Sequence, residues 1–85
     1  MIELKSDVTG LEEAVIHVKG EIDMNTSPKL RELLKSPEAQ KMKKITVELS
    51  SVTYMDSSGI ATLVECLQSL SARKGQLTLK AMRPE

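Results

Sequence analysis

Residues 53–62 read TYMDSSGIAT and join two segments of different hydrophobic period. Upstream, Ile45, Val47 and Leu49 alternate with polar residues, as expected for a strand with one buried face. Downstream, apolar residues recur every three or four positions, as expected for a helix with one buried face. They are Ile60, Leu63, Val64, Leu67 and Leu70. The chain is therefore predicted to change from strand to helix at the sequence DSSG.

The N-terminal residues predict a β-hairpin. Residues 2–5 are expected to form one strand, residues 7–10 a turn, and residues 14–19 a second strand with one apolar and one polar face. His17 lies on the polar face of the second strand. We expect it to be an ordinary surface histidine, because no second metal ligand or catalytic base lies near it in the sequence.

A first helix is predicted to begin at Thr26 or Ser27. Pro28 follows, and proline suits the first turn of a helix because the N–H that it lacks would have no partner there. The apolar stripe of this helix consists of Leu30, Leu33 and Leu34. Pro37 is expected to end or break the helix. The lysines beyond it predict a solvated corner before the next strand: Lys41, Lys43 and Lys44.

The helix after the DSSG junction is predicted to run from residue 58 to residue 74. Arg73 and Lys74 suit the negative end of the helix dipole, and Gly75 is expected to adopt the left-handed conformation that stops a helix. Cys66 is expected to be a small packing residue within this helix. A last strand is predicted over residues 76–81, with its two leucines facing inward.

Together these elements predict a single domain of the α/β class. Each clear strand alternates, whereas strands covered on both faces are continuously apolar, so we expect helices packed mainly on one face of the sheet. Strand-helix-strand connections make neighbouring strands parallel, and the opening hairpin adds an antiparallel pair. The predicted sheet is therefore small, mixed and mostly parallel.

Composition argues against several classes of function. The 85 residues include 12 basic and 12 acidic side chains, so the chain lacks the basic surface of proteins that bind nucleic acids or anionic membranes. Tyr54 is the only aromatic residue, and one cysteine with one histidine makes neither an internal disulfide nor a zinc site. No apolar segment approaches the ~20 residues of a membrane span, and the first residues lack the apolar core of a signal peptide. We expect a cytoplasmic protein that does not insert into membranes.

The DSSG junction has two interpretations. In the first, an oxygen of Asp56, Ser57 or Ser58 caps the helix and Gly59 only relaxes a tight turn, and these four residues taken alone favour this one. In the second, the junction also presents a hydroxyl at the carboxyl end of the strands, where α/β sheets commonly bind ligands or are modified. A phosphate there would meet free N–H groups at the helix start and would change the surface with little demand on the fold.

Catalysis is not expected at this junction. A nucleophilic serine needs a neighbouring base, and His17 is placed in the middle of a strand. The chain has no GxSxG motif and no glycine-rich phosphate loop, and it offers no set of residues that would hold a metal or a cofactor. We therefore expect a protein that is not an enzyme and that has no cofactor.

Three segments of the chain carry a family resemblance: GEID at residues 20–23, the strand ITVELSSVTYM at residues 45–55, and MDSSG at residues 55–59, which opens a helix. In this order and at this spacing they resemble the STAS-domain anti-sigma-factor antagonists of bacteria. The similarity extends over residues 15–81. These segments in this order favour a working site over a helix cap alone. The resemblance also implies a small sheet covered by helices on one face.

The resemblance implies a role for each residue of the junction. Ser57, directly after the aspartate, corresponds to the phosphoacceptor of the family, and Ser58 to the helix-start residue beside it. The implied partner is a serine kinase that is also an anti-sigma factor, bound by the unphosphorylated protein and released after phosphorylation. The implied partner-binding residues are Asp23, Met24, Asn25, Thr26, Asp56, Ser57, Ser58 and Gly59.

Two further expectations follow from the family. STAS subunits of lipid-transport ABC systems are an alternative function, although the intact DSSG motif favours the phosphorylation switch. Family members usually continue into a further helix after the last strand, whereas this sequence continues as MRPE, with Pro84 where that helix would begin. Either the sequence is part of a longer chain or this member is short. In the second case we expect a single STAS domain over residues 1–85 without that helix, an apolar surface left open beside the helix at 58–74 and the last strand, and either self-association or marginal stability of the chain alone.

Overall fold

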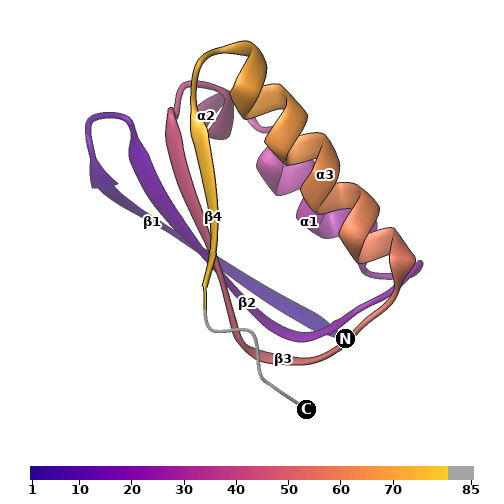
Figure 1. Cartoon of the computed structure of the whole chain (residues 1–85). Coiled ribbons are helices and arrows are strands. Elements are labelled where there is room, and N and C mark those ends of the chain that lie inside the picture. Colours follow the sequence, from indigo (N-terminus) through magenta and orange to yellow (C-terminus); the bar gives the residue numbers. More distant parts are fainter. Residues whose placement is uncertain (81–85) are drawn as a thin grey trace.

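The computed structural model describes residues 1–80, which form a four-stranded sheet with helices on one face (Figure 1). The elements in chain order are β1 (Ile2–Gly10), β2 (Glu13–Ile22), α1 (Ser27–Leu34), α2 (Pro37–Gln40), β3 (Lys44–Met55), α3 (Ser57–Ala72) and β4 (Gln76–Lys80).

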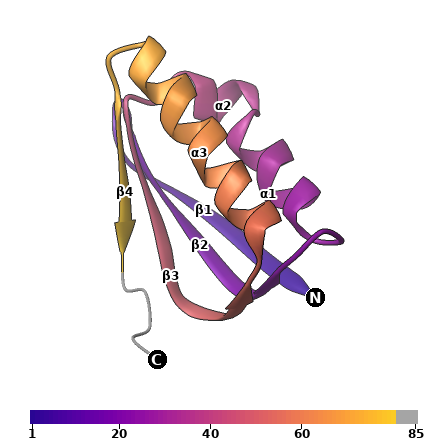
Figure 2. The same cartoon turned by 45° about the vertical axis from the view of Figure 1, so that its right-hand side comes forward.

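The strands lie in the order β1-β2-β3-β4. β1 and β2 are antiparallel, whereas β2 pairs with β3 and β3 pairs with β4 in parallel. Figure 2 shows all three helices on the same side of the sheet. The predicted α/β class, the mixed sheet and the placement of the helices on one face are confirmed.

The core lies between the sheet and the helices, and the alternation along the strands explains it. Ile45, Val47 and Leu49 of β3 are at most 1% exposed, and their polar neighbours face the uncovered side of the sheet. Leu30 and Leu34 of α1 pack onto the same core. Cys66 of α3 is buried there too, which confirms it as a packing residue.

The buried face of α3 is not the predicted one. Leu63 and Leu70 are buried, but Ile60, Val64 and Leu67 are 57%, 44% and 46% exposed. Gly59, Thr62 and Cys66 complete the buried side. The reason is the position of α3, which lies against α1 on one flank and has only the edge strand β4 near the other. Helical spacing alone cannot tell these two flanks apart.

The hairpin is longer than predicted. The predicted turn at residues 7–10 is wrong, because β1 continues to Gly10 and the chain reverses at residues 11–12. Asp7 lies within the strand, and its carboxylate is 3.1 Å from Nε2 of His17 on β2. The Asp7–His17 pair lies on the face of the sheet without helices. Asp7, which was predicted to lie in a turn, therefore belongs to the strand and contacts β2 across the hairpin.

The predicted helix break at Pro37 is confirmed, whereas the predicted end of α3 differs. α1 ends at Leu34, and Pro37 begins the short helix α2, which the Ser36 side chain caps by accepting a hydrogen bond from the N–H of Ala39 at 3.2 Å. At the end of α3 the left-handed residue is Lys74, with φ of 62°, and not Gly75. Glycine is needed at position 75 for space, since a Cβ there would lie 2.7 Å from the Lys43 carbonyl oxygen. The predicted strand end at Ala81 and the predictions made on Pro84 lie outside the described residues.

Candidate functional site

The site forms where β2 and β3 end side by side. Ile22 pairs with Met55 in the parallel ladder, and the N–H of Asp56 donates to the Ile22 carbonyl at 3.0 Å. Because parallel strands end at the same edge of the sheet, the loop at residues 23–26 lies beside the start of α3. The two segments that the sequence singled out, residues 23–26 and 56–59, are thus brought together.

Asp56 caps α3. One carboxylate oxygen, Oδ1, accepts hydrogen bonds from the Ser58 N–H at 2.9 Å and from the Ser58 hydroxyl at 2.6 Å. The hydrogen bond from the Ser58 side chain lowers the pKa of Asp56, and the N–H groups of Ser58, Gly59 and Met24 add to this effect. Asp56 is therefore a carboxylate at neutral pH, and its charge is shared between the helix start and the loop that contains Met24.

Ser57 and Ser58 have different environments although they are adjacent. The Ser58 side chain is half-buried and its hydroxyl is bound to Asp56. Ser57, the first residue of α3, is exposed, and among the side-chain hydrogen bonds found within residues 1–80 none involves its hydroxyl. Of the two serines, Ser57 is the one whose oxygen an incoming reagent can reach.

Hydrogen bonds around Asp23 and Thr26 shape the neighbouring loop. The Asp23 carboxylate accepts from the N–H groups of Asn25 and Thr26 at 2.9 and 3.1 Å. The Thr26 hydroxyl donates to the Glu21 carbonyl at 2.7 Å and accepts from the Asp23 N–H at 2.9 Å. Thr26 is only 8% exposed, whereas Met24 is 76% exposed. The loop is therefore a closed turn that presents Met24 and Asn25 outward.

Gly59 allows α3 to lie close to the ends of β2 and β3. A Cβ at this position would be 2.6 Å from Cγ2 of Ile22 and 2.6 Å from Cγ of Met55. Gly59 is itself buried. Glycine is needed at position 59 because α3 lies this close to the strands, and not only for the relaxed turn that the sequence suggested.

The eight predicted binding residues occupy one continuous region but not one surface. Met24, Asn25 and Ser57 are exposed, Asp23, Asp56 and Ser58 are half-buried, and Thr26 and Gly59 are buried. The sequence did not distinguish these groups. One signal for Thr26 was present, because an aspartate followed three residues later by a threonine just before a helix is typical of a hydrogen-bonded turn.

The site is an open surface and not a cavity. None of the four described cavities, of about 240 to 520 Å³, is lined by Asp23, Asp56 or Ser57. Within residues 1–80 there is no group of His, Cys, Asp and Glu side chains that could hold a metal ion, and no helix there is long and apolar enough to cross a membrane. An exposed hydroxyl beside a protruding loop is suited to contact with another protein.

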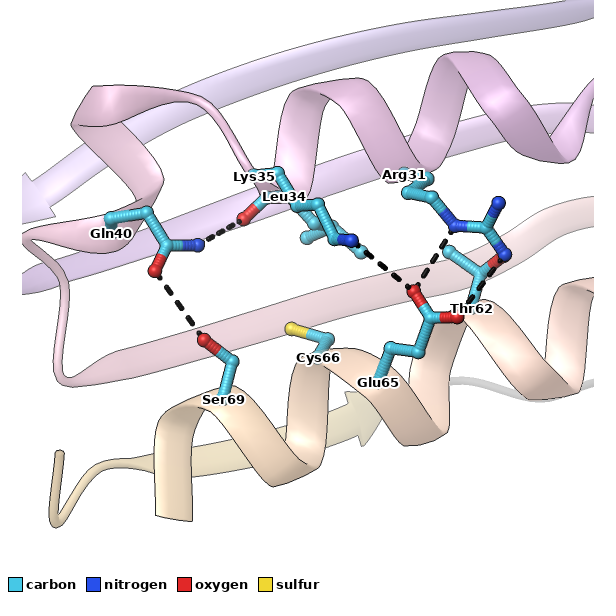
Figure 3. A pocket seen from close by; sticks show the side chains of 8 residues that line it. All are labelled: Arg31, Leu34, Lys35, Gln40, Thr62, Glu65, Cys66 and Ser69. Atoms are coloured by element: carbon cyan, nitrogen blue, oxygen red, sulfur yellow. Dashed lines mark hydrogen bonds and ion pairs between the residues drawn. The ribbon is translucent and has the colours of Figure 1, made fainter. Parts of the chain in front are cut away.

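The cavity between α1 and α3, of about 310 Å³, is built by interhelical contacts (Figure 3). Arg31 of α1 donates from Nε and Nη2 to the Glu65 carboxylate of α3 at 3.1 and 3.3 Å, and Lys35 lies 3.7 Å from it. Cys66 lines the same cavity, and burial raises the pKa of its thiol. A protonated, buried thiol is a poor nucleophile, so this cavity has no evident reactive group.

Similarity to known proteins extends over most of the chain. The family model described as STAS domain matches residues 5–85. The anti-sigma-B factor antagonist of Listeria monocytogenes is 38% identical over 64 residues, which are 75% of this chain and 56% of that protein. The chain thus spans little more than half the length of the relatives it matches.

Solved structures share the fold. The anti-sigma factor antagonist SpoIIAA in its unphosphorylated form has a TM-score of 0.81 with 24% identity, and the match covers 96% of this chain and 76% of that one. An anti-sigma factor antagonist from Mycobacterium paratuberculosis has a TM-score of 0.79 with 25% identity, covering 93% and 66% of the two chains. At these identities the likeness concerns the arrangement of the helices and strands.

Proposed function

This chain belongs to the STAS domain family, and from that premise we propose that it is an anti-sigma-factor antagonist controlled by phosphorylation of Ser57. Without phosphate it binds an anti-sigma factor, and a sigma factor is set free. With phosphate on Ser57 it releases that partner. The observation that carries the proposal is the exposed hydroxyl of Ser57 on the first turn of α3, beside a loop that presents Met24 and Asn25.

Phosphorylation of Ser57 would change the surface more than the fold. The phosphate brings a charge of about −1.5 to −2 to a position next to the Asp56 carboxylate. The start of α3 favours this charge, because its first N–H groups and its dipole are positive there. Asp56 opposes it. A partner that packs over Met24, Asn25 and Ser57 would have to accommodate both charges, which is the reason for its release.

In this proposal the eight residues of the site fall into groups with different roles. Met24, Asn25 and Ser57 contact the partner directly. Asp23 and Thr26 hold the loop in its closed turn, and Asp56, Ser58 and Gly59 fix the start of α3 against the strand ends. The chain itself is not an enzyme. The phosphate is supplied by a serine kinase that is also the anti-sigma factor, and both proteins act in the cytoplasm.

The proposal is tested by phosphorylation. The chain is used to capture its partner from the source cells, the partner is incubated with the chain and ATP, and the modified residue is mapped by mass spectrometry. We expect one phosphate on Ser57 in the wild type and none in Ser57→Ala. The control Ser71→Ala, which removes an exposed serine at the other end of α3, should also carry one phosphate on Ser57. Capture of a transporter ATPase in place of a kinase, or phosphate incorporation that persists in Ser57→Ala, would contradict the proposal.

A further inference from the structure

The two halves of the candidate site are carried by two neighbouring helices. The loop at residues 23–26 leads directly into α1, which begins at Ser27, and Ser57 is the first residue of α3. From these starts the two helices run side by side over the sheet (Figure 2). The position of Met24 and Asn25 relative to Ser57 therefore depends on how α1 is seated against α3.

Apolar packing alone does not fix this seating. The cavity of about 310 Å³ lies between the two helices, and Leu34 and Cys66 are its buried apolar residues. The other side chains that line it are polar or charged. Two helices separated by a cavity make fewer van der Waals contacts than the elements of a close-packed core, so these contacts restrict their relative position less. The contacts that span the cavity are polar.

An ion pair joins the two helices across this cavity (Figure 3). Arg31 of α1 donates from two nitrogens to the two carboxylate oxygens of Glu65 on α3, and the Lys35 ammonium lies 3.7 Å from the same carboxylate. A guanidinium that binds both oxygens of a carboxylate fixes their distance and their relative orientation. At 41% and 42% exposure such a pair adds little to the stability of the fold. Its main effect is on the position of α1 relative to α3.

The α3 side of this pair is connected to the start of the helix. Thr62, on the turn before Glu65, lines the cavity, and its buried hydroxyl donates to the Ser58 carbonyl at 2.9 Å. The Ser58 hydroxyl in turn donates to Asp56, which caps the helix beside Ser57. The first turns of α3 are thus one hydrogen-bonded unit. A movement of α1 against Glu65 is therefore also a movement of α1 against Ser57.

We propose that Arg31 and Glu65 are positioning residues for the candidate site. Their pairing sets the place of Met24 and Asn25 relative to Ser57, and thereby the fit of the protein that binds there. Neither residue of the pair has to touch that protein. The effect on position concerns the chain alone, whereas the effect on binding rests on the function proposed for Ser57.

The first test uses NMR of the backbone amides of the full 85-residue chain. Glu65→Arg replaces attraction between the helices by repulsion and should shift the amide resonances of Asn25 and Ser57, although α3 rises about 12 Å between residues 57 and 65. The double variant Arg31→Glu with Glu65→Arg restores the pair and should return these resonances towards their wild-type values. Gln68→Arg is the control, because it adds an arginine at an exposed position of α3 and leaves the pair intact. It should leave both resonances unchanged, and melting temperatures check that each variant is folded.

The second test measures recognition by the kinase that the wild-type chain captures. In Glu65→Arg the KM for phosphorylation of Ser57 should rise by about fivefold, and kcat should stay the same because the helix start keeps its geometry. The double variant should recover the wild-type KM.

Three results would overturn the proposal. They are unshifted resonances of Asn25 and Ser57 in Glu65→Arg, an unchanged KM in that variant, and a double variant as impaired as the single one. The last result would place Glu65 itself in contact with the partner. If the wild-type chain is not phosphorylated at all, the proposed function fails, and the resonances of the variants still decide whether the pair positions the loop.

Discussion

At the scale of single residues, Asp56 links the fold to the site. Its carboxylate accepts two hydrogen bonds from Ser58, and the N–H of Met24 contributes to the low pKa of Asp56. This arrangement binds the Ser58 hydroxyl and leaves the Ser57 hydroxyl exposed. The cap thus gives the two adjacent serines different environments, and a substitution at Asp56 should affect both the helix and the candidate site.

The low pKa of Asp56 predicts a pH dependence of stability. Because its pKa is lower in the folded than in the unfolded chain, the contribution of this carboxylate is present above the usual pKa of about 3.9 and is lost as the pH falls through the folded value. Asp56→Asn keeps a capping oxygen but cannot titrate. In urea unfolding, the unfolding free energy of the wild type should exceed that of Asp56→Asn at pH 7, and the difference should shrink below about pH 4. A difference that stays constant from pH 7 to pH 3 would show that Asp56 is not stabilised as an anion.

Adding a single methyl group at position 59 is predicted to lower the stability of the fold. In Gly59→Ala the new Cβ meets Ile22 and Met55 at 2.6 Å, and overpacking of this kind costs about 1–3 kcal/mol. The better helix propensity of alanine returns at most about 1 kcal/mol. We expect a lower melting temperature for Gly59→Ala. Gly10→Ala is the control, because its Cβ has no neighbour closer than 3.5 Å; equal melting temperatures for the two variants would contradict the packing at Gly59.

Part of this residue-scale detail could be predicted from the sequence. A cap at the DSSG junction followed from the residue types, and the structure confirms it with Asp56. The sequence could not show that Ser58 is bound and Ser57 exposed, because that depends on the backbone turn at the helix start, which brings the N–H and the hydroxyl of Ser58 to the Asp56 carboxylate. The burial of Thr26 likewise depends on the Glu21 carbonyl, a backbone group that no residue pattern reveals.

At the scale of elements, α3 has two apolar flanks with different neighbours. Leu63 and Leu70 face the core, whereas Val64 and Leu67 line an apolar groove between α3 and β4. The sequence predicted the helix correctly but assigned all five apolar residues to one buried face. Periodicity gives the direction of a side chain around the helix axis, whereas burial depends on whether the sheet extends beneath it, and β4 is the last strand on that side.

This difference predicts unequal effects of the same substitution. Leu63→Ala removes a side chain that is 6% exposed and should cost about 2–5 kcal/mol of unfolding free energy through the cavity it leaves. Leu67→Ala, at 46% exposure, should cost about 1 kcal/mol or less in the monomer. Chemical denaturation at a protein concentration below that of self-association measures both. If Leu67→Ala were as damaging as Leu63→Ala, the groove flank of α3 would have to be buried in the monomer.

The strands also show that hydrophobic periodicity locates an element better than it locates its ends. Alternation located all four of them, but β1 and β2 extend beyond their predicted ends at Lys5 and Lys19. Asp7 was predicted to lie in a turn, but it pairs with Val15 of β2 and its carboxylate contacts His17. In a sheet with one open face, polar side chains are compatible with a strand, so they do not mark its end.

At the scale of the whole molecule, the covered face and the strand ends have separate roles. The helices lie on one face and supply the core, as the alternation predicted. The parallel pairing of β2 and β3 brings the loop at residues 23–26 and the start of α3 to one edge of the sheet. The site can therefore change its charge without disturbing the core, which is the property that a phosphorylation switch requires.

The most direct test of the proposed phosphorylation switch is the affinity of the chain for the proposed anti-sigma-factor partner in each state. Isothermal titration would compare the unphosphorylated wild type, the wild type phosphorylated at Ser57, Ser57→Asp and Ser57→Ala, with melting temperatures measured alongside. We predict that the unphosphorylated wild type and Ser57→Ala bind alike, and that phosphorylation and Ser57→Asp weaken binding by about tenfold or more while the melting temperature barely moves. Equal affinities for the phosphorylated and unphosphorylated chains would contradict the account.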